Sequence, residues 1–370
     1  MGNYKKQVSV LQIVTGIDVG GVSTFLLQYY KNIDRERIHF DIVAIDVGRD
    51  QMFANDFREL GANIFYMPKN YYLRAIYLFK LIKKNKYDCV HSHIELPSAI
   101  YLSIAKLCGV NKRFAHAHMA FLDYSSPIKL CMRFLLNKVC TLRMGCSKNA
   151  LHGLFGKYAD KGIVIHNAID LTRFVFNSKI RNTYRDNFGW RNNFVVGYVG
   201  RLTYQKNVFF LLEIFKYILA KKENAILVVV GNGELKEQFI EKAKELDIFN
   251  KVSLLDPRHD IENLMMGMDV LLLPSRWEGL GIVLIEAQAV SLKCVTSRET
   301  VPYEDTNITK YIYYCSINDN PQIWAQTVIE NCIGYERVDT SSELISHKYD
   351  IRAEGKTLSD IYLNACLSNK

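Results

Sequence analysis

The sequence lacks long hydrophobic runs. None of its 370 residues falls in a window of the roughly 18 uncharged apolar residues that a membrane-spanning helix requires. Low-complexity tracts and internal repeats of fixed period are also missing. The first apolar stretch has no small-residue cleavage site, so it predicts a strand rather than a signal peptide. With 49% hydrophobic and 23% charged residues, the chain is expected to fold into two globular domains of ordinary size.

Paired cysteines are missing as well. The chain has nine cysteines, an odd number for a disulfide framework, and no two of them form a Cys-x-x-Cys pair. Several lie in apolar runs, which indicates buried free thiols in a reducing cytoplasm and argues against a cysteine-based metal site. A Walker A sequence is absent too, so a P-loop nucleotide site is not expected.

Acidic residues are scarce in one segment. Residues 69–148 hold 14 Lys and Arg but 3 Asp and Glu, a net charge of +11, whereas the remaining 290 residues sum to −2. Its most basic pieces, residues 71–86 and 126–143, mix Lys and Arg with aliphatic and aromatic side chains at helical spacing. Each could be a helix packed on a sheet with a solvated basic edge, but together they favour an anionic membrane surface as partner. A nucleic-acid partner is not expected, because no recognised motif or interleaved aromatic platform accompanies the charge.

Short β-branched runs alternate with amphipathic helical stretches, which predicts parallel α/β architecture. The predicted strands are residues 8–15, 40–45, 63–68, 88–93, 113–118 and 163–167, followed by 194–200, 225–231, 251–256, 269–274 and 293–297. The polar stretch 167–193 separates the two series. We therefore expect one domain over residues 1–180 and a second over 181–349, with a C-terminal helix in 350–370 returning to the first. Two doubly wound sheets would place ligands at the carboxyl ends of their strands, in a cleft between the domains.

Two cations follow the first strand of the second series. Arg201 and Lys206 come after Gly200, and a helix begins near Asn207. A guanidinium fork, an ammonium and a helix amino terminus together suit a diphosphate. Ordinary surface Arg and Lys would give the same pattern, so both interpretations are open.

Glycine turns link two other strands to helices. One contains Gly231 and Gly233, and the other contains Gly20 and Gly21. Glycine lets the backbone approach a ligand closely. Neither loop has the G-x-G-x-x-G spacing of a dinucleotide site, so an ordinary tight turn is the simpler explanation of each.

Four histidines stand at the ends of two predicted strands: His91, His93, His116 and His118. Alternate residues share one face of a strand, so His116 and His118 could bind a metal. No third ligand stands at a convincing spacing. We therefore predict a polar role at the edge of the cleft and no metal site.

Two glutamates eight positions apart occur in SRWEGLGIVLIEAQAV, residues 275–290. Glu278 lies in a glycine turn whose free amides, at the start of the next helix, could donate to ligand oxygens. Glu286 lies inside the apolar helix, where an unpaired carboxylate would cost several kcal/mol. A vicinal diol such as a ribose would satisfy it, and so would an Arg or Lys hidden by the fold.

Together these segments resemble the retaining glycosyltransferases of family 4, which have the GT-B fold. The strongest similarity is the pair of glutamates in PSRWEGLGIVLIEAQA. GGVSTFLLQYY, GCSKNALHGLFG, IVIHNAIDLTRF and GRLTYQKN also match, in order, so the resemblance covers nearly the whole chain. It implies an α/β fold of two Rossmann-like, doubly wound parallel-sheet domains facing a cleft. The variant is similar to bacterial enzymes that build capsular, exopolysaccharide or O-antigen chains.

The resemblance implies a role for each candidate residue. Arg201 and Lys206 would hold the donor diphosphate and stabilise the leaving group in place of a metal, in keeping with the absence of an Asp-x-Asp motif. Glu286 would hold the ribose, Glu278 the transferred sugar, and His118 would contact donor sugar or acceptor. The other positions implied to bind the donor are Gly20, Gly21, Gly200, Gly231, Gly233, Arg258 (near the base), Gly279, Leu280 and Gly281.

The implied reaction moves a hexose or N-acetylhexosamine from a nucleotide sugar, with UDP favoured, to a lipid-linked or saccharide acceptor, with retention of configuration and without a metal or other cofactor. The basic first domain suits an acceptor at the inner face of the cell membrane. A cytoplasmic enzyme bound peripherally to that face is therefore expected. A nucleotide-sugar epimerase of the same fold is the alternative, and a basic nucleic-acid binder is a remote one.

Overall fold

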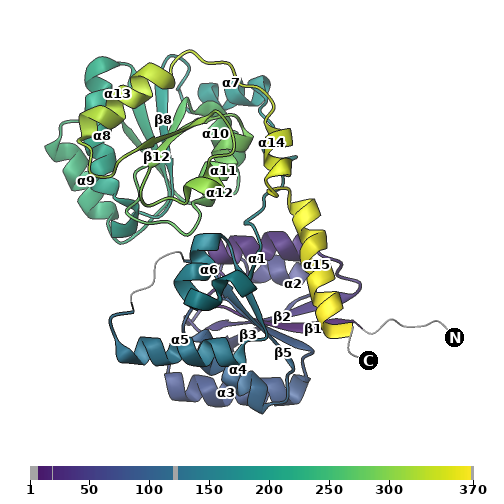
Figure 1. Cartoon of the computed structure of the whole chain (residues 1–370). Coiled ribbons are helices and arrows are strands. Elements are labelled where there is room, and N and C mark those ends of the chain that lie inside the picture. Colours follow the sequence, from purple (N-terminus) through teal and green to yellow (C-terminus); the bar gives the residue numbers. More distant parts are fainter. Residues whose placement is uncertain (1–6, 19, 120–123, 368–370) are drawn as a thin grey trace. The chain divides into compact units, whose positions relative to one another are not determined.

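The computed structural model describes residues 7–18, 20–119 and 124–367, and the chain forms two units (Figure 1). The first comprises the chain up to Ile169 together with the segment from Asp350 onward, and the second runs from Asp170 to Tyr349. The boundary thus comes before the predicted residue 180. The reason is helix α7, Ser178–Asn187, whose Arg181 and Arg185 both pair with Asp269 of the second unit, at 2.5 and 3.0 Å.

The first unit is built on a seven-stranded parallel sheet in the order β3-β2-β1-β4-β5-β6-β7. Its strands are β1 Val8–Ile13, β2 Ile38–Ile45, β3 Asn63–Met67, β4 Cys89–Ser92, β5 Lys112–Ala117, β6 Leu142–Gly145 and β7 Ile163–Val164. One face is covered by α1 Gly21–Asn32, α2 Ala54–Glu59 and α15 Ile351–Leu367, and the other by α3 Tyr71–Asn85, α4 Ser98–Leu107, α5 Pro127–Val139 and α6 Lys148–Phe155. A 3₁₀ helix, η1 Gly156–Lys161, follows α6.

The second unit is built on a six-stranded parallel sheet in the order β10-β9-β8-β11-β12-β13. Its strands are β8 Phe194–Val199, β9 Ala225–Val230, β10 Val252–Leu255, β11 Val270–Leu273, β12 Lys293–Ser297 and β13 Ile312–Cys315. Besides α7, its helices are η2 Tyr204–Lys206, α8 Val208–Lys221, α9 Lys236–Glu245, η3 Phe249–Lys251, α10 Ile261–Gly267, α11 Ile282–Ala289, α12 Tyr303–Thr306, α13 Pro321–Asn331 and α14 Ser341–Ser346.

The predicted α/β class is confirmed, and each of the eleven predicted strands is present, shifted at some ends by a few residues. Two strands were missed. The sequence of β6 follows directly on the basic helical stretch and was taken as its end, although α5 ends at Val139. The sequence of β13 is only four residues long and lies between polar segments, so it gave no periodic signal.

Both sheets reverse their strand order beside their first strand, between β1 and β4 in the first unit and between β8 and β11 in the second. At such a point the loops after neighbouring strands diverge and leave room for a ligand at the carboxyl edge. The loops there contain Gly20 and Gly21 in the first unit, and Arg201 and Glu278 in the second.

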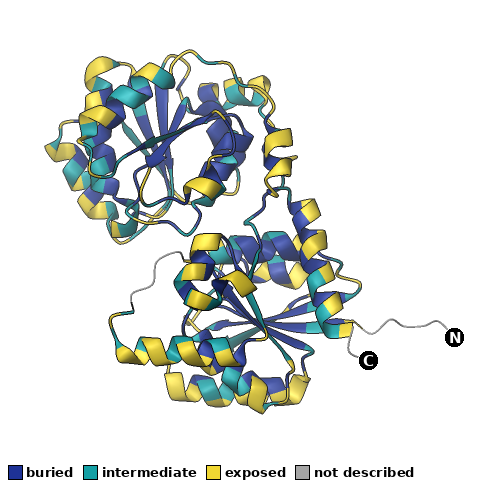
Figure 2. Cartoon of the chain, in the orientation of Figure 1, coloured by how far each residue is buried: buried dark blue, intermediate teal, exposed yellow. Residues whose placement is uncertain are grey.

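The prediction of thiols outside any disulfide is confirmed: none of the nine cysteines forms a disulfide, and six of them are buried. In the part of the chain that the structure describes, no helix is both long enough and apolar enough to cross a membrane. Figure 2 shows the strands of both sheets buried beneath helices whose outer faces are exposed.

Candidate functional site

The loop after β8 carries the two predicted cations. Arg201 is exposed, and among the described residues its guanidinium has no hydrogen-bond or ion-pair partner. Lys206 ends η2, and Asn207, in the left-handed region at φ 54°, leads into α8. The predicted start of this helix is therefore confirmed.

Lys206 is paired with Glu278. Its Nζ lies 2.6 Å from Glu278 Oε1, and the two side chains are only 15% and 6% exposed. The fold thus joins two predicted site residues that lie 72 positions apart in the sequence. Shielding from water makes such a pair stronger than a surface ion pair, and it makes the loss of either partner costly.

Gly231 and Gly233 are required by the protein's own backbone. A Cβ on Gly231 would lie 2.1 Å from the carbonyl oxygen of Gly200, and one on Gly233 would lie 2.3 Å from that of Leu202. Hydrogen bonds hold this loop against the loop after β8, with Leu202 N donating to Asn232 O at 3.0 Å. The two glycines therefore fix the position of the loop that carries Arg201, and their contact with a donor stays a prediction.

Glu286 lies half-buried on α11, and no described residue forms a hydrogen bond or ion pair with it. The cation that acts on it electrostatically, Arg173, is instead bonded to Glu262, with Nη2 and Oε1 2.7 Å apart. Desolvation, and then repulsion by Glu262, raise the pKa of Glu286 to about 7, against a smaller opposing effect of Arg173. Within the described chain, no Arg or Lys pairs with Glu286, so the interpretation that a hidden basic residue satisfies it is not supported.

The turn before α11 offers backbone donors. Gly281 caps this helix in the left-handed region at φ 76°, a conformation that favours glycine. A Cβ on it would lie 3.6 Å from Cγ of Glu278, so the turn and the carboxylate are in contact range. Among the described residues, the amides of Leu280 and Gly281 donate no hydrogen bond. They are available to ligand oxygens at the amino terminus of α11.

Arg258 has a partner inside the protein. It forms two hydrogen bonds with Asp260, both 2.8 Å long, and its guanidinium lies 5.4 Å from the ring centre of Phe188. The hydrogen bonds from Arg258 lower the pKa of Asp260 to about 2. The predicted position of Arg258 near the base of the nucleotide therefore stays a prediction. Its contacts with Asp260 and Phe188 also give Arg258 a structural role.

The glycines at the start of α1 differ from those after β9. Gly20 is extended, and Gly21 is the first residue of the helix. A Cβ on Gly21 would meet no atom within 4 Å, and one on Gly20 would just reach a backbone oxygen at 4.0 Å. The packing of the described protein does not require a glycine at either position, which is what a loop kept clear for a ligand would show.

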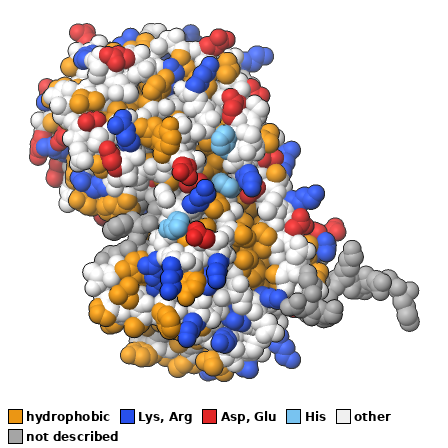
Figure 3. Space-filling model, in the orientation of Figure 1, with side chains coloured by type: hydrophobic (Ala, Val, Ile, Leu, Met, Phe, Trp, Pro, Cys, Tyr) orange, Lys and Arg blue, Asp and Glu red, His pale blue; other side chains and the backbone are white. Residues whose placement is uncertain are grey.

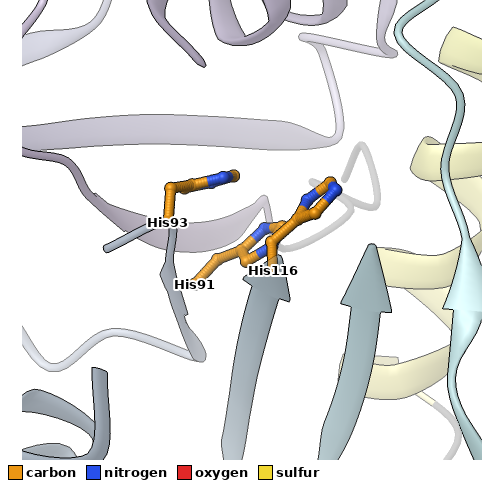
Figure 4. A group of neighbouring side chains, drawn as sticks. All are labelled: His91, His93 and His116. Atoms are coloured by element: carbon orange, nitrogen blue, oxygen red, sulfur yellow. The ribbon is translucent and has the colours of Figure 1, made fainter. Parts of the chain in front are cut away.

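The four histidines form one cluster over β4 and β5. Their ring centres lie 4.2 to 5.4 Å apart, and Nδ1 of His93 lies 2.9 Å from Nε2 of His118. The sequence spacing showed no third metal ligand, but the fold supplies candidates: one ring nitrogen each of His91, His93 and His116 lie within 4.8 Å of one another (Figure 4). The two His-x-His pairs stand on adjacent parallel strands, and a register between those strands was the signal that could have shown it.

Glu95 is a further charged group beside this cluster that the sequence did not single out. Its Oε1 accepts a hydrogen bond from the backbone amide of His118, at 2.7 Å. Burial raises the pKa of Glu95 to about 7 and lowers the pKa of the His118 ring to about 3. His118 is therefore neutral at pH 7, so one of its ring nitrogens can donate a hydrogen bond and the other can accept one.

Two cavities in the described chain lie elsewhere. They measure about 650 and 600 Å³, and no predicted site residue lines either of them. The candidate site therefore rests on the loops at the carboxyl edges of the sheets and not on these hollows.

Comparison with known proteins identifies the family of the chain. A model of "Glycosyltransferase Family 4" matches residues 19–173, and one of "Glycosyl transferases group 1" matches residues 180–331. The UDP-Gal:alpha-D-GlcNAc-diphosphoundecaprenol alpha-1,3-galactosyltransferase of Escherichia coli is 30% identical over 300 residues, which are 75% of this chain and 76% of that protein. The chain belongs to glycosyltransferase family 4.

A further relative of this family 4 glycosyltransferase and two solved structures that share its fold are also similar to the chain. The putative glycosyltransferase EpsF of Bacillus subtilis is 27% identical over 87% of each chain. Anabaena HepE in complex with UDP-glucose matches with a TM-score of 0.75 at 17% identity over 98% of both chains. A glycosyltransferase from Rickettsia africae matches with a TM-score of 0.76 at 18% identity, over 98% of this chain and all of that one. The predicted GT-B fold, with two Rossmann-like parallel-sheet domains, is confirmed.

Proposed function

We propose that this glycosyltransferase moves a hexose or N-acetylhexosamine from a UDP-sugar to a lipid-linked saccharide during the assembly of a cell-surface polysaccharide, with retention of configuration. One observation carries the proposal. Glu286 places a carboxyl group on an apolar helix, in the unit that also holds Lys206 and Glu278, and no described residue bonds to it. A ribose supplies two vicinal hydroxyl groups, which are the donors that such a carboxylate lacks.

The diphosphate of the donor would lie on the loops after β8 and β11. Arg201 has an unpartnered guanidinium that can bond two phosphate oxygens at once. Lys206 has three N–H donors and gives one of them to Glu278, which leaves donors for phosphate and leaves Oε2 of Glu278 for a sugar hydroxyl. The amides of Leu280 and Gly281 would add two more donors.

In the proposed reaction, the bond from the anomeric carbon to the diphosphate breaks while a bond to the acceptor oxygen forms on the same face. The acceptor's proton passes to the leaving diphosphate oxygen, and the negative charge on that diphosphate is stabilised by Arg201 and Lys206. No protein nucleophile and no metal take part in this step. His118, in the first unit, would contact the donor sugar or the acceptor.

The relatives support the choice of substrates. The E. coli relative is named for UDP-Gal and for a diphosphoundecaprenol-linked sugar, and the Anabaena structures hold UDP and UDP-glucose. The relatives EpsF of Bacillus subtilis and CapH of Staphylococcus aureus are named as a glycosyltransferase and a capsular polysaccharide biosynthesis glycosyltransferase. This chain belongs to the same family and aligns with most of the length of these relatives, so we propose a related acceptor.

A surface of α3, α4 and α5 that combines exposed apolar and basic side chains supports the proposal of a lipid-linked acceptor. These neighbouring helices bury their inner sides against the sheet, yet their outer sides expose large apolar residues: Tyr71, Tyr72, Leu73, Ile76, Phe79, Ile100, Leu107, Ile128, Leu130, Phe134 and Leu135. Lys80, Lys83, Lys84, Lys86 and Lys138 are exposed among them. Figure 3 shows apolar and basic side chains side by side over this part of the first unit. A helix that only packed on a sheet would be expected to show a solvated basic edge but not these exposed apolar residues. An anionic bilayer would attract the basic residues and accommodate the apolar ones.

Acceptor dependence tests the reaction. UDP-sugars are screened for thermal stabilisation of the protein, and the best donor is then incubated with membrane extract. We expect UDP release that requires the extract and a radiolabelled sugar that moves into the lipid fraction. Release of UDP without acceptor, with a changed sugar as the only product, would instead support the epimerase.

Vesicle sedimentation tests the surface. We expect the protein to sediment with vesicles rich in phosphatidylglycerol and not with pure phosphatidylcholine, and the double variant Ile128→Glu/Phe134→Glu to stay in solution. Tyr217→Glu, which changes an exposed aromatic residue on α8, serves as the matched control. Equal sedimentation of the double variant and the control would contradict the assignment of this surface.

A further inference from the structure

Three of the four clustered histidines of the first unit, His91, His93 and His116, are not explained by the transfer reaction. His91 lies on β4, His93 directly follows its last residue, His116 lies on β5, and all three are buried. Their strands are adjacent and parallel, with His91 opposite Phe114, so the next residues on the same face, His93 and His116, also lie opposite each other. The register therefore brings three imidazoles from two strands to one point of the sheet, as Figure 4 shows.

Two of these rings have nitrogens that the protein leaves without a partner. Both ring nitrogens of His116 and Nε2 of His91 are buried and form no hydrogen bond in the described chain. Burying a polar nitrogen without a partner costs free energy, and buried imidazoles are normally satisfied. Around His116 are the rings of Phe25, His91, His93 and His118, and none of them bonds to it.

The hydrogen bonds at the outer side of the cluster direct lone pairs inward. Gln12 donates through Nε2 to the hydroxyl of Tyr362, at 3.0 Å, so its Oε1 accepts from Nε2 of His93, at 2.9 Å. The lone pair of His93 is then on Nδ1. Nδ1 of His91 lies 2.6 Å from the same Tyr362 hydroxyl, and when it donates there, the lone pair of His91 is on the unpartnered Nε2.

We infer that His91, His93 and His116 form a binding site for a divalent transition metal, with Zn²⁺ as the ion that best suits three neutral imidazoles. One ring nitrogen of each residue already lies within 4.8 Å of the other two. Zinc–nitrogen bonds of about 2.0–2.1 Å place tetrahedral ligands about 3.4 Å apart, so ring rotations that move each nitrogen by about an ångström would suffice.

The surroundings have the features of a metal site. Burial lowers the pKa of His91 to about 3 and holds those of His93 and His116 well below the usual range, so all three present the neutral form that binds metal. The other ring nitrogens of His91 and His93 are held by Tyr362 and Gln12, as the second ligand shell of a zinc site usually is. Tyr362 lies on α15, so the ion would also tie the C-terminal helix to β4 and β5.

The bound ion would replace one contact of the free protein. Nδ1 of His93 accepts a hydrogen bond from Nε2 of His118, and this nitrogen would turn to the metal. His118 is only partly buried, so its N–H can turn to water instead. The site lies in the first unit, and the transfer step proposed above does not pass through it.

Metal stoichiometry tests the inference directly. The full chain is stripped with a chelator, incubated with two equivalents of ZnCl₂, passed through a desalting column and analysed by atomic absorption. We expect about one zinc per chain for the wild type and for the control His152→Ala/His347→Ala, which removes two exposed histidines. His116→Phe and His116→Gln should each lose at least nine-tenths of the metal. Co²⁺ should give the visible bands of tetrahedral nitrogen ligation with the wild type and the control but not with the His116 variants.

Thermal unfolding supplies a second readout. Zinc at one hundred times its Kd should raise the Tm of the wild type by roughly 5–10 °C and leave that of the His116 variants unchanged. His116→Phe should fold at least as well as the metal-free wild type, because it removes two unsatisfied nitrogens, and His116→Gln serves if the larger ring does not fit. A wild type that retains no zinc, or His116 variants that retain a full equivalent, would overturn the assignment, as would loss of zinc from the control.

Discussion

The replacement of Glu286 by Gln tests the donor site, because the variant keeps the shape of the side chain and removes its charge. In the wild type the pKa of this carboxyl group is raised from 4.5 to about 7, first by desolvation and then by Glu262. A raised pKa means that the folded protein favours the protonated form. The wild type therefore loses stability as the pH rises from 4.5 through 7, and the loss is complete above that range.

The magnitude follows from the size of the shift. A change of about 2.5 pKa units corresponds to about 3 kcal/mol, and this value is an upper bound because water reaches the half-buried carboxyl group. The Glu286→Gln variant is neutral at every pH and does not carry this penalty. At pH 8 it should be the more stable protein by up to about 3 kcal/mol, and at pH 4.5 the two should be equal in urea unfolding.

Donor binding should change in the opposite direction. A carboxylate that accepts two ribose hydroxyls contributes charged hydrogen bonds, each worth about 1.5–3 kcal/mol, so Glu286→Gln should raise the Kd for a UDP-sugar about 10- to 100-fold at pH 8. The wild-type Kd should rise about tenfold between pH 8 and pH 6, because the ligand must bind the ionised form. That pH dependence should vanish in the variant. Glu95, whose pKa is also raised to about 7, is still present in the variant, so it cannot account for a pH dependence that disappears.

Calorimetric titration at pH 6, 7 and 8 measures these affinities, and Glu241→Gln, an exposed glutamate of α9, is the matched control. Wild-type affinity in Glu286→Gln at pH 8 would refute the reasoning. So would a variant that is less stable than the wild type at pH 8, because it would show that the carboxylate is satisfied within the protein.

Three further predictions separate fold from function. Lys206→Met and Glu278→Gln should each destabilise the protein by about 1–3 kcal/mol in urea unfolding. The double variant should recover more than half of this loss in stability and still lack transferase activity. Additive losses of stability would contradict a shielded pair. Gly231→Ala should lower stability by about 1–3 kcal/mol in the same assay, because its Cβ would overlap a backbone oxygen at 2.1 Å, and an unchanged midpoint would show that the loop yields freely. Gly21→Ala should raise stability by roughly 0.5–1 kcal/mol, since it meets no atom and favours the helix, yet reduce donor turnover; full activity would remove this glycine from the site.

The sequence predicted the parts of the fold that depend on local patterns. Strands such as Ala225–Val230 are continuous apolar runs that must be buried on both faces, and the helix at Tyr71–Asn85 shows its amphipathic period directly. Strand β6 could not be separated from the basic helix before it, because Leu142–Gly145 continues the same mixture of apolar and basic residues. The boundary was expected in the polar stretch 167–193 but was placed at residue 180 instead of Ile169, because the pair of Arg181 with Asp269, which spacing does not reveal, joins α7 to the second unit.

The candidate site was predicted residue by residue, but its internal contacts were not. The pairing of Lys206 with Glu278 depends on how the loops after β8 and β11 meet, and 72 residues separate the two side chains. The third histidine needed the register of β4 against β5, which a single sequence does not contain. Glycines were ambiguous for the same reason: Gly231 and Gly21 look alike in sequence, and only the space around each distinguishes a packing requirement from an open approach.

The two groups that best indicate a ligand are the ones that the fold leaves unsatisfied. Arg201 is a cation and Glu286 an anion in the same unit, and neither is paired with the other or with any other described residue. A chain selected for stability alone would gain by pairing or neutralising them, as it has done with Arg173 and Glu262. A nucleotide sugar carries both complements, a diphosphate for the guanidinium and a ribose diol for the carboxylate. Holding the two charges apart at the carboxyl edge of one sheet would keep the proposed donor site preorganised, because binding would not have to break an internal ion pair.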